Sequence, residues 1–204
     1  RLARKIRSEL GCEVIMTRDR DRYLTLEERT AIANTQNADL FISIHTNASR
    51  DRRAYGLETY FLNLATDEEA IRVAAMENAT STKNISDLQK ILFDLMQNAK
   101  INESSRLAAY VQTAMVVHLR NKRYTRVKSK GVKQAPFYVL LGAQMPSILI
   151  EAAFISNPRE CKRLVNPMFQ ERIAEGIVQG IRQYIKATSP TAFRKQLLHS
   201  QPRG

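Results

Sequence analysis

Two short apolar runs constrain the fold of this chain more than any other feature. They occupy residues 40–44, within "ADLFISIHTNAS", and residues 147–150, within "SILIEAAF". Continuous apolar runs of this length are typical of strands that are buried on both faces of a parallel sheet. A strongly polar residue follows each run, His45 after the first and Glu151 after the second. The sequence therefore predicts two interior strands, each with a polar group at its carboxyl end.

The rest of the chain alternates between strand and helix patterns. Thr25 and Glu28 form a capping-box pattern, which predicts a helix beginning near Leu26, and a long helical stretch is expected from about residue 67 to 123. Such alternation indicates an α/β fold. We expect one domain with a mostly parallel or mixed central sheet flanked by helices. The further expected strands are 13–18 (EVIMTR), 56–62 (GLETYFL) and 137–141 (FYVLL).

Helix-start signals assign several polar residues to structure. Asn157 before Pro158 predicts a helix start with Glu160 closing a capping box, and the Asn-Pro pair at 166–167 predicts another. A Ser86/Gln89 pair precedes a strongly amphipathic helix over residues 84–98. The apolar face of that helix needs a cover, which is either the body of this protein, a partner, or both in turn.

Composition narrows the class of protein. The chain has 204 residues, 44% of them hydrophobic, and no Pro/Gly/Ser-rich linker, which favours a single core. The net charge of +12 favours anionic surroundings such as nucleic acid, anionic lipid or an acidic wall polymer, without choosing among them. No apolar run is long enough for a transmembrane segment. The two cysteines, Cys12 and Cys161, fit packing rather than a disulfide framework.

A basic run over residues 120–133 contains seven cations and no acid. It could hold an anionic polymer near a site, but a solvated helix end and loop is the commoner meaning of such a run. Only Tyr124 interleaves the cations, and the chain has no Trp. Nucleic acid is therefore not expected as a partner.

His45 and Glu151 together indicate a site. The carboxyl ends of strands in an open α/β sheet are where ligands bind. A histidine there is by itself more often structural, whereas a carboxylate beside "ILI" is costly to bury without a partner. The chemistry that uses both is metal-assisted hydrolysis, with an imidazole binding zinc and a carboxylate transferring protons. No Gly-x-Ser-x-Gly elbow and no activated cysteine supports a nucleophilic alternative.

Four stretches carry a resemblance to a known family: "TRDRDRYLTLEERTAIANTQNADLFISIHTNAS", "GLETYFLN", "GVKQAPFYVLLGAQMPSILIEAAFISNPRE" and "IAEGIVQGIRQYI". From about residue 1 to 185 the chain resembles the zinc-dependent N-acetylmuramoyl-L-alanine amidases of bacterial cell-wall remodelling. The resemblance implies that His45 binds Zn²⁺ and that Glu151 is the catalytic glutamate. The implied reaction is cleavage of the amide between N-acetylmuramic acid and the L-alanine of the stem peptide in peptidoglycan. We also take Asn47 as a candidate substrate-binding residue.

The resemblance implies further zinc ligands that this chain lacks. In the family, a His in a Gly-His-Gly-Gly-type stretch and a following Glu also bind the metal, and we expect both upstream of Arg1, together with the signal peptide of a periplasmic or envelope protein. His118 shares a helix face with apolar residues and fits a core position, and His199 lies in a loosely ordered tail over 187–204. The alternative is an inactive amidase-like domain, within residues 1–186, that binds peptidoglycan or a division partner.

Family members that are activated by partners at cell division carry a helical insertion that blocks the site. By that resemblance, residues 67–103 form such an insertion and Glu77 is an inhibitory zinc ligand. The helix at 84–98 would then be the element that an activator protein displaces. The plain alternative is that Glu77 is a solvated helix residue.

Overall fold

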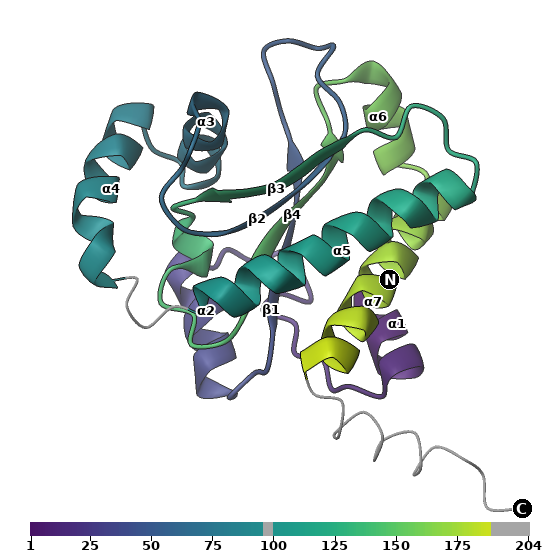
Figure 1. Cartoon of the computed structure of the whole chain (residues 1–204), viewed down its shortest axis with the longest axis horizontal. Coiled ribbons are helices and arrows are strands. Elements are labelled where there is room, and N and C mark those ends of the chain that lie inside the picture. The colour runs from purple at the N-terminus through teal and green to yellow at the C-terminus, as the bar shows by residue number, and fades with distance from the viewer. Residues whose placement is uncertain (96–99, 189–204) are drawn as a thin grey trace, which may run out of the picture.

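Four strands form one mixed sheet in the order β1-β4-β2-β3 (Figure 1). The computed structural model describes residues 1–95 and 100–188, without the side chains of 90–95. β1 runs parallel to β4, β2 runs parallel to β3, and the two pairs meet where β2 and β4 run antiparallel. The α/β fold with a mixed sheet is thereby confirmed. The strands are β1 (Phe41–Asn47), β2 (Leu57–Leu62), β3 (Ser129–Ala135) and β4 (Ser147–Phe154).

Helices cover both faces of this sheet (Figure 1). One core lies between the sheet and α1, α5 and α7, and it includes Leu57, Ile148 and Ile150. The other lies between the sheet and α2, α3 and α4, and it includes Tyr60 and Leu149. The helices are α1 (Leu2–Lys5), continued by a π-turn (Ile6–Leu10), α2 (Leu26–Thr35), α3 (Glu68–Glu77), α4 (Thr82–Leu95), α5 (Ile101–Asn121), α6 (Pro158–Leu164) and α7 (Pro167–Thr188).

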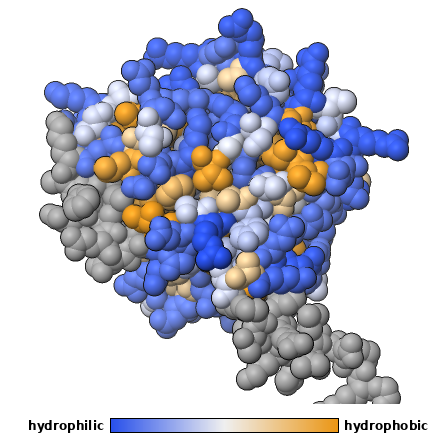
Figure 2. All heavy atoms as spheres, viewed as in Figure 1, coloured by the Kyte–Doolittle hydropathy of each residue, from blue (hydrophilic) through white to orange (hydrophobic). Residues whose placement is uncertain are grey.

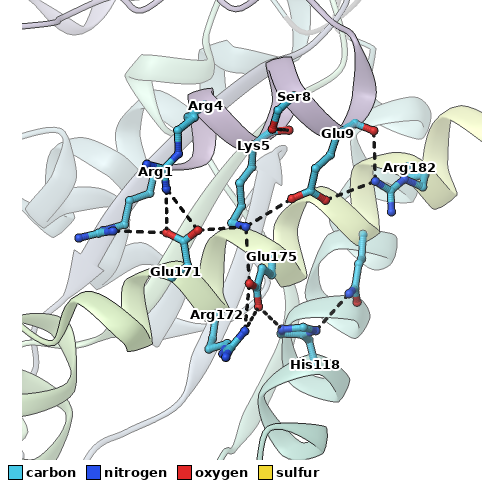
Figure 3. A network of polar contacts seen from close by, with 11 residues as sticks. Arg1, Arg4, Lys5, Ser8, Glu9, His118, Glu171, Arg172, Glu175 and Arg182 are labelled. Atoms are coloured by element: carbon cyan, nitrogen blue, oxygen red, sulfur yellow. Dashed lines mark hydrogen bonds and ion pairs between the residues drawn. The ribbon is translucent and has the colours of Figure 1, made fainter. Parts of the chain in front are cut away.

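The first helix is fastened to α7 by a network of ion pairs (Figure 3). Lys5 lies 3.0 Å from the carboxylate of Glu171 and 3.5 Å from that of Glu175. Glu175 also accepts hydrogen bonds from Arg172, and its carboxylate contacts His118 of α5. Because these ion pairs are partly screened by solvent, each contributes little to the free energy of folding. Their main effect is to orient α1 on α7.

α5 and α7 pack at the closest approach that their backbones allow. A Cβ on Gly180 would lie 2.5 Å from Cα of Val111 and 2.8 Å from the carbonyl oxygen of Tyr110. A Cβ on Gly176 would lie 2.7 Å from Cα of Met115. Because the obstructing atoms are backbone, a side chain at either glycine would push the helices apart.

Gly180→Ala should therefore destabilise the fold, although alanine usually stabilises a helix relative to glycine. We expect a loss of about 2 to 3 kcal/mol in the free energy of unfolding, measured by urea denaturation, as is usual for an overpacked core. Gln183→Ala is the matched control, because Gln183 is exposed on the same helix. An unchanged midpoint for Gly180→Ala would contradict the close crossing of α5 and α7.

Most of the expected helix starts are confirmed. Thr25 and Glu28 form the reciprocal capping box at the start of α2. Asn157 caps α6 through the backbone N–H groups of residues 159 and 160, and Asn166 caps α7 in the same way. The capping box at Glu160 was wrong, because its buried carboxylate accepts hydrogen bonds from the backbone of Gly56 and Phe154.

The Ser86/Gln89 start of the amphipathic helix was also wrong. α4 begins one turn earlier, at Thr82, and Ser86 donates a hydrogen bond to the carbonyl of Thr82 within the helix. Gln89 instead accepts a hydrogen bond from the backbone N–H of Ala65. Ile85 is fully buried on the inner face of α4. From residue 90 onward, the side chains of the predicted face lie outside the described part of the chain.

Two of the expected strands do not form. Residues 13–18 have no regular structure, and Ile15 and Met16 are about half exposed, because this segment pairs with no strand among the described residues. Residues 137–141 contain a short 3-10 helix over Tyr138–Leu140. The remaining strand of the sheet is β3, which begins within the basic run that was expected to be a helix end and loop and continues two residues beyond it.

β1 departs from the expectation of a strand buried on both faces. It pairs only with β4 among the described residues, and Ile44 is 47% exposed, whereas every residue of β4 is buried. Both strands also continue beyond their polar residues, to Asn47 and Phe154.

In the described ranges, every helix is too short or too polar to serve as a membrane span. His199 and the expected tail from residue 189 onward lie outside those ranges.

Candidate active site

Three polar residues lie in one row across the sheet. His45 of β1 is the register partner of Glu151 of β4, and Glu151 is the register partner of Glu58 of β2. Directly opposed residues on neighbouring strands project from the same face. This face is the one covered by α3, since Tyr60 and Leu149, two residues from Glu58 and Glu151 in their strands, pack in the core on that side. The sheet therefore brings an imidazole and two carboxylates together.

Glu151 is the most unusual member of the row. Its side chain is 0% exposed, and neither carboxylate oxygen has a hydrogen-bond partner among the described residues. Burial, followed by the neighbouring carboxylates of Glu77 and Glu58, raises the pKa of Glu151 to about 9. This shift favours the neutral carboxyl group at pH 7, and no described residue occupies the hydrogen-bonding positions of its two oxygens.

Glu58 is equally buried but is surrounded by partners. The hydroxyl of Tyr60 donates a hydrogen bond of 2.5 Å to Glu58 Oε2, and Asn47 Nδ2 donates one of 3.3 Å to the same oxygen. Lys130 Nζ lies 2.6 Å from Glu58 Oε1. Burial opposes the charged form of Lys130, but the carboxylates of Glu58 and Glu69 outweigh it and raise the pKa of this lysine. A carboxylate with close polar partners therefore lies beside Glu151, which has none among the described residues.

α3 lies over this row and contacts both ends of it. At the start of α3, Glu69 pairs with Lys130 and Lys133 of β3. Partial burial alone would raise the pKa of Glu69, but these two lysines lower it to about 2. At the end of α3, the carboxylate of Glu77 contacts His45 Nδ1. The helix packs down through small buried residues, which permit this close approach: Ala70, Val73, Ala74 and Ala75.

The donor atoms near His45 suit zinc in part. Imidazole nitrogen and carboxylate oxygen are both common zinc ligands, and Glu77 already faces one ring nitrogen. The other ring nitrogen lies 3.0 Å from Ser43 Oγ. Within the described ranges, no cluster of three or more His, Cys, Asp or Glu side chains is placed to hold a metal ion. His45 and Glu77 are thus two donors of a set that usually has three in catalytic zinc sites.

Comparison with known proteins identifies the family. The model of the N-acetylmuramoyl-L-alanine amidase family matches residues 1–183. This chain belongs to that amidase family. It is 33% identical over 205 residues to the amidase AmiC of Escherichia coli O6:H1 (strain CFT073), a match that covers 95% of this chain and 48% of AmiC. The chain therefore spans about half the length of that relative.

Solved amidases have the same fold. The N-acetylmuramoyl-L-alanine amidase from Clostridium difficile 630 superposes with a TM-score of 0.68 at 30% identity, over 92% of this chain and 80% of that one. The CwlD amidase from Clostridioides difficile, solved in complex with the GerS lipoprotein, gives a TM-score of 0.63 at 25% identity, over 91% and 82% of the two chains. The mixed sheet between helical layers is thus the amidase fold.

In this amidase domain, the four predicted site residues lie together. His45, Glu151, Glu77 and Asn47 all meet on the α3 side of the sheet. His118 does not join them. It is 8% exposed on α5, where it contacts Glu175 and Gln179 of α7, as expected for a core-edge histidine.

Glu58 and Lys130 were not predicted as site residues. "GLETYFL" was treated only as a strand, although it places a carboxylate in an apolar strand just as "SILIE" does. Applying the cost of an unpaired buried charge to Glu58 would have predicted a buried cation nearby. That reasoning leads to Lys130, because β3 is parallel to β2 and pairs Glu58 with Gly131, the residue next to Lys130.

Proposed function

We propose that this chain is the catalytic domain of a peptidoglycan amidase, which cleaves the amide between N-acetylmuramic acid and the L-alanine of the stem peptide. The observation that carries the proposal is that His45 of β1 and Glu151 of β4 are register partners on neighbouring strands. The carboxyl group of Glu151 is fully buried, and its oxygens have no hydrogen-bond partner among the described residues. A group of this kind is costly to maintain in a core, so its place beside an imidazole is best explained by chemistry. Family membership supplies the substrate class.

Three residues of the site have a role in this proposal. His45 is one ligand of Zn²⁺. Further ligands, besides Glu77, complete the zinc site. When bound, zinc activates a water molecule for attack on the amide carbonyl. Glu151 takes the proton of the attacking water and passes it to the leaving amine. Asn47 binds substrate through its buried Oδ1 atom once the site opens, since this atom has no hydrogen-bond partner among the described residues and Nδ2 donates to Glu58.

The described structure corresponds to a closed state in this proposal. In this state Glu77, whose carboxylate contacts His45 Nδ1, acts as an inhibitory zinc ligand, and its charge helps to keep Glu151 protonated. Residues 67–103 then form a regulatory insertion within a catalytic domain of residues 1–186. An activator protein that engages the helix at 84–98 would draw α3 away, since α4 packs on α3. The CwlD–GerS complex is a precedent for an amidase that binds a protein partner.

Because the proposed substrate is peptidoglycan, we propose that the protein is located in the cell envelope. In a bacterium with two membranes this location is the periplasm. The relative AmiC is named for the same reaction. A role in cell division fits a hydrolase that stays closed until a partner opens it. No step of the proposal requires nucleic acid.

A second function is favoured by one observation. Within the described ranges, only two zinc-type donors converge at His45, and catalytic sites usually have three protein ligands. A domain that retains the amidase fold but lacks a functional metal site would bind peptidoglycan or a division partner without cleaving it. Binding without release of stem peptide would distinguish this function from catalysis.

Metal analysis of His45→Ala tests the proposal. We expect the whole protein encoded by the gene to bind close to one zinc per chain. We also expect it to release stem peptide from purified peptidoglycan. His45→Ala should lower zinc affinity by at least about a hundredfold, since loss of one outer-sphere partner alone costs 10- to 100-fold. His118→Ala is the control, because this histidine lies between α5 and α7. Equal zinc binding by both variants would exclude His45 as a ligand.

A further inference from the structure

The turn after α5 and the junction between α6 and α7 form one continuous surface. Arg163 of α6 donates a hydrogen bond of 2.7 Å to the carbonyl of Thr125, and its guanidinium lies 5.7 Å from the centre of the Tyr124 ring. The ring of Tyr124 also packs edge-to-face on Phe169 of α7, with ring centres 5.3 Å apart. In Figure 1 this region is at the upper right, where α5 ends and α6 lies.

This surface is strongly basic. Four of its cations are exposed and form no ion pair within the part of the chain that the structure describes. They are Lys122, Arg123, Arg126 and Lys162. The nearby acids are already engaged: Glu160 is buried against backbone N–H groups, and Glu171 pairs with Arg1 and Lys5 (Figure 3). We call the surface the corner patch; it consists of Lys122, Arg123, Arg126, Lys162, Arg163, Val165 and Met168.

Two aliphatic side chains project from the middle of these cations. Val165 is 74% exposed and Met168 is 55% exposed, three residues apart where α6 ends and α7 begins. Side chains of this type are usually buried. Figure 2 shows how largely hydrophilic the molecular surface is on the side viewed, with hydrophobic residues gathered in small patches. An aliphatic pair bordered by unpaired cations has the chemistry of a surface that meets both phosphate groups and hydrocarbon.

We propose that the corner patch binds the surface of a membrane that contains anionic phospholipid. Val165 and Met168 enter the boundary between headgroups and acyl chains, while the surrounding cations pair with lipid phosphates. Neither interaction is sufficient alone: two aliphatic side chains bury little area, and cations without insertion are easily displaced by salt. Together they give reversible attachment, independent of the catalytic row.

A nucleic acid or another soluble polyanion fits the patch less well. Binding of single-stranded nucleic acid relies on aromatic faces for base stacking. Tyr124 is the aromatic residue within the basic turn, and its ring already contacts Arg163 and Phe169. A soluble polyanion also leaves Val165 and Met168 in water, whereas a membrane surface uses them.

The backbone of the turn allows charges to be removed without harming the fold. Arg123 and Arg126 have φ angles of 60° and 53°, a region that favours glycine. Arg123 also occupies the position after the end of α5 where glycine is the usual residue, since the N–H of Tyr124 bonds back to the carbonyl of Leu119. The double variant Arg123→Gly/Arg126→Gly therefore removes two charges at conformationally suitable sites.

Co-sedimentation of the full chain with lipid vesicles tests the proposal. We expect binding to phosphatidylcholine vesicles that contain phosphatidylglycerol, and none to phosphatidylcholine alone. Arg123→Gly/Arg126→Gly should weaken the binding by roughly 30-fold, because each cation near an anionic membrane contributes about a fivefold factor in affinity. Arg20→Gln/Lys83→Gln removes two exposed cations outside the patch and should change the affinity much less.

A second variant separates the membrane from a soluble polyanion. Val165→Ser/Met168→Ser should weaken binding to anionic vesicles several-fold and leave binding to inorganic polyphosphate unchanged. The proposal is overturned if wild-type protein ignores anionic vesicles, or if the serine variant binds them as tightly as wild type. Circular dichroism of each variant confirms that a loss of binding does not reflect unfolding.

Discussion

Glu151→Gln should reduce the release of stem peptide from peptidoglycan by about 10²- to 10⁴-fold, the range that a positioned acid–base group contributes. Glutamine has nearly the same shape as glutamate and fits the fully buried position, but it cannot take a proton from water or pass one to the leaving amine. The measurement is the rate of stem-peptide release from purified peptidoglycan with zinc present. Zinc content should stay at the wild-type value, because Glu151 is placed here as an acid–base group rather than a ligand. Retention of more than a tenth of the activity would remove Glu151 from the mechanism.

The same variant should be more stable than wild type, which shows that lost activity is not lost folding. The pKa of Glu151 is about 9 in the folded chain and 4.5 in the reference state. Between these values the unfolded chain loses a proton that the folded chain retains, so wild-type stability falls as pH rises from 4.5 to 9. Glutamine does not titrate. The gain should be near zero below pH 4.5 and roughly 3 kcal/mol at pH 7.

Urea unfolding of the metal-free chain at several pH values checks this gain. Glu27→Gln is the control, because Glu27 is exposed on α2. Its difference from wild type is the baseline with which the Glu151→Gln difference is compared. A Glu151→Gln difference that is flat between pH 5 and 8 would mean that the buried carboxyl group is solvated or paired in the folded state.

The sequence predicted the parts of the site that depend on local pattern and strand pairing. Two apolar runs ending in His45 and Glu151 were enough to expect two strands whose polar residues lie at one edge of the sheet, and the structure makes the two residues register partners. Helix starts at Thr25 and Asn157 also followed from local chemistry, since a cap needs only residues within one turn. These predictions succeeded because few distant contacts decide them.

The failures lie where distant contacts decide the structure. Residues 13–18 have the composition of a strand but find no partner strand among the described residues. The error for β3 was the opposite one: a strand formed where a loop was expected. Its lysines indicated a solvated loop, yet Lys130 and Lys133 reach the carboxylates of Glu58 and Glu69, which come from β2 and α3. A lysine in an interior position is predictable only when its carboxylate partner is already known.

Glu77→Gln should raise basal amidase activity about 10- to 100-fold. The carboxylate of Glu77 contacts a ring nitrogen of His45, where it competes with any other use of the imidazole. A hydrogen bond to a charged group is worth about 1.5 to 3 kcal/mol, which sets the expected range. Glutamine retains the size of the side chain but loses the charge. The measurement is stem-peptide release by the gene product without any activator.

Loss of the charge should also lower the pKa of Glu151, because Glu77 is one of the two carboxylates that raise it. Acid–base catalysis by Glu151 then becomes possible at lower pH, so the pH profile of the basal activity should move toward acid. Glu68→Gln is the matched control: Glu68 is exposed at the other end of α3, and the substitution removes an equal charge. A rise in activity with Glu68→Gln as well would point to a loosened helix rather than to release of His45. If Glu77→Gln leaves the activity unchanged while zinc binds normally, Glu77 does not restrain His45 and the closed state has another cause.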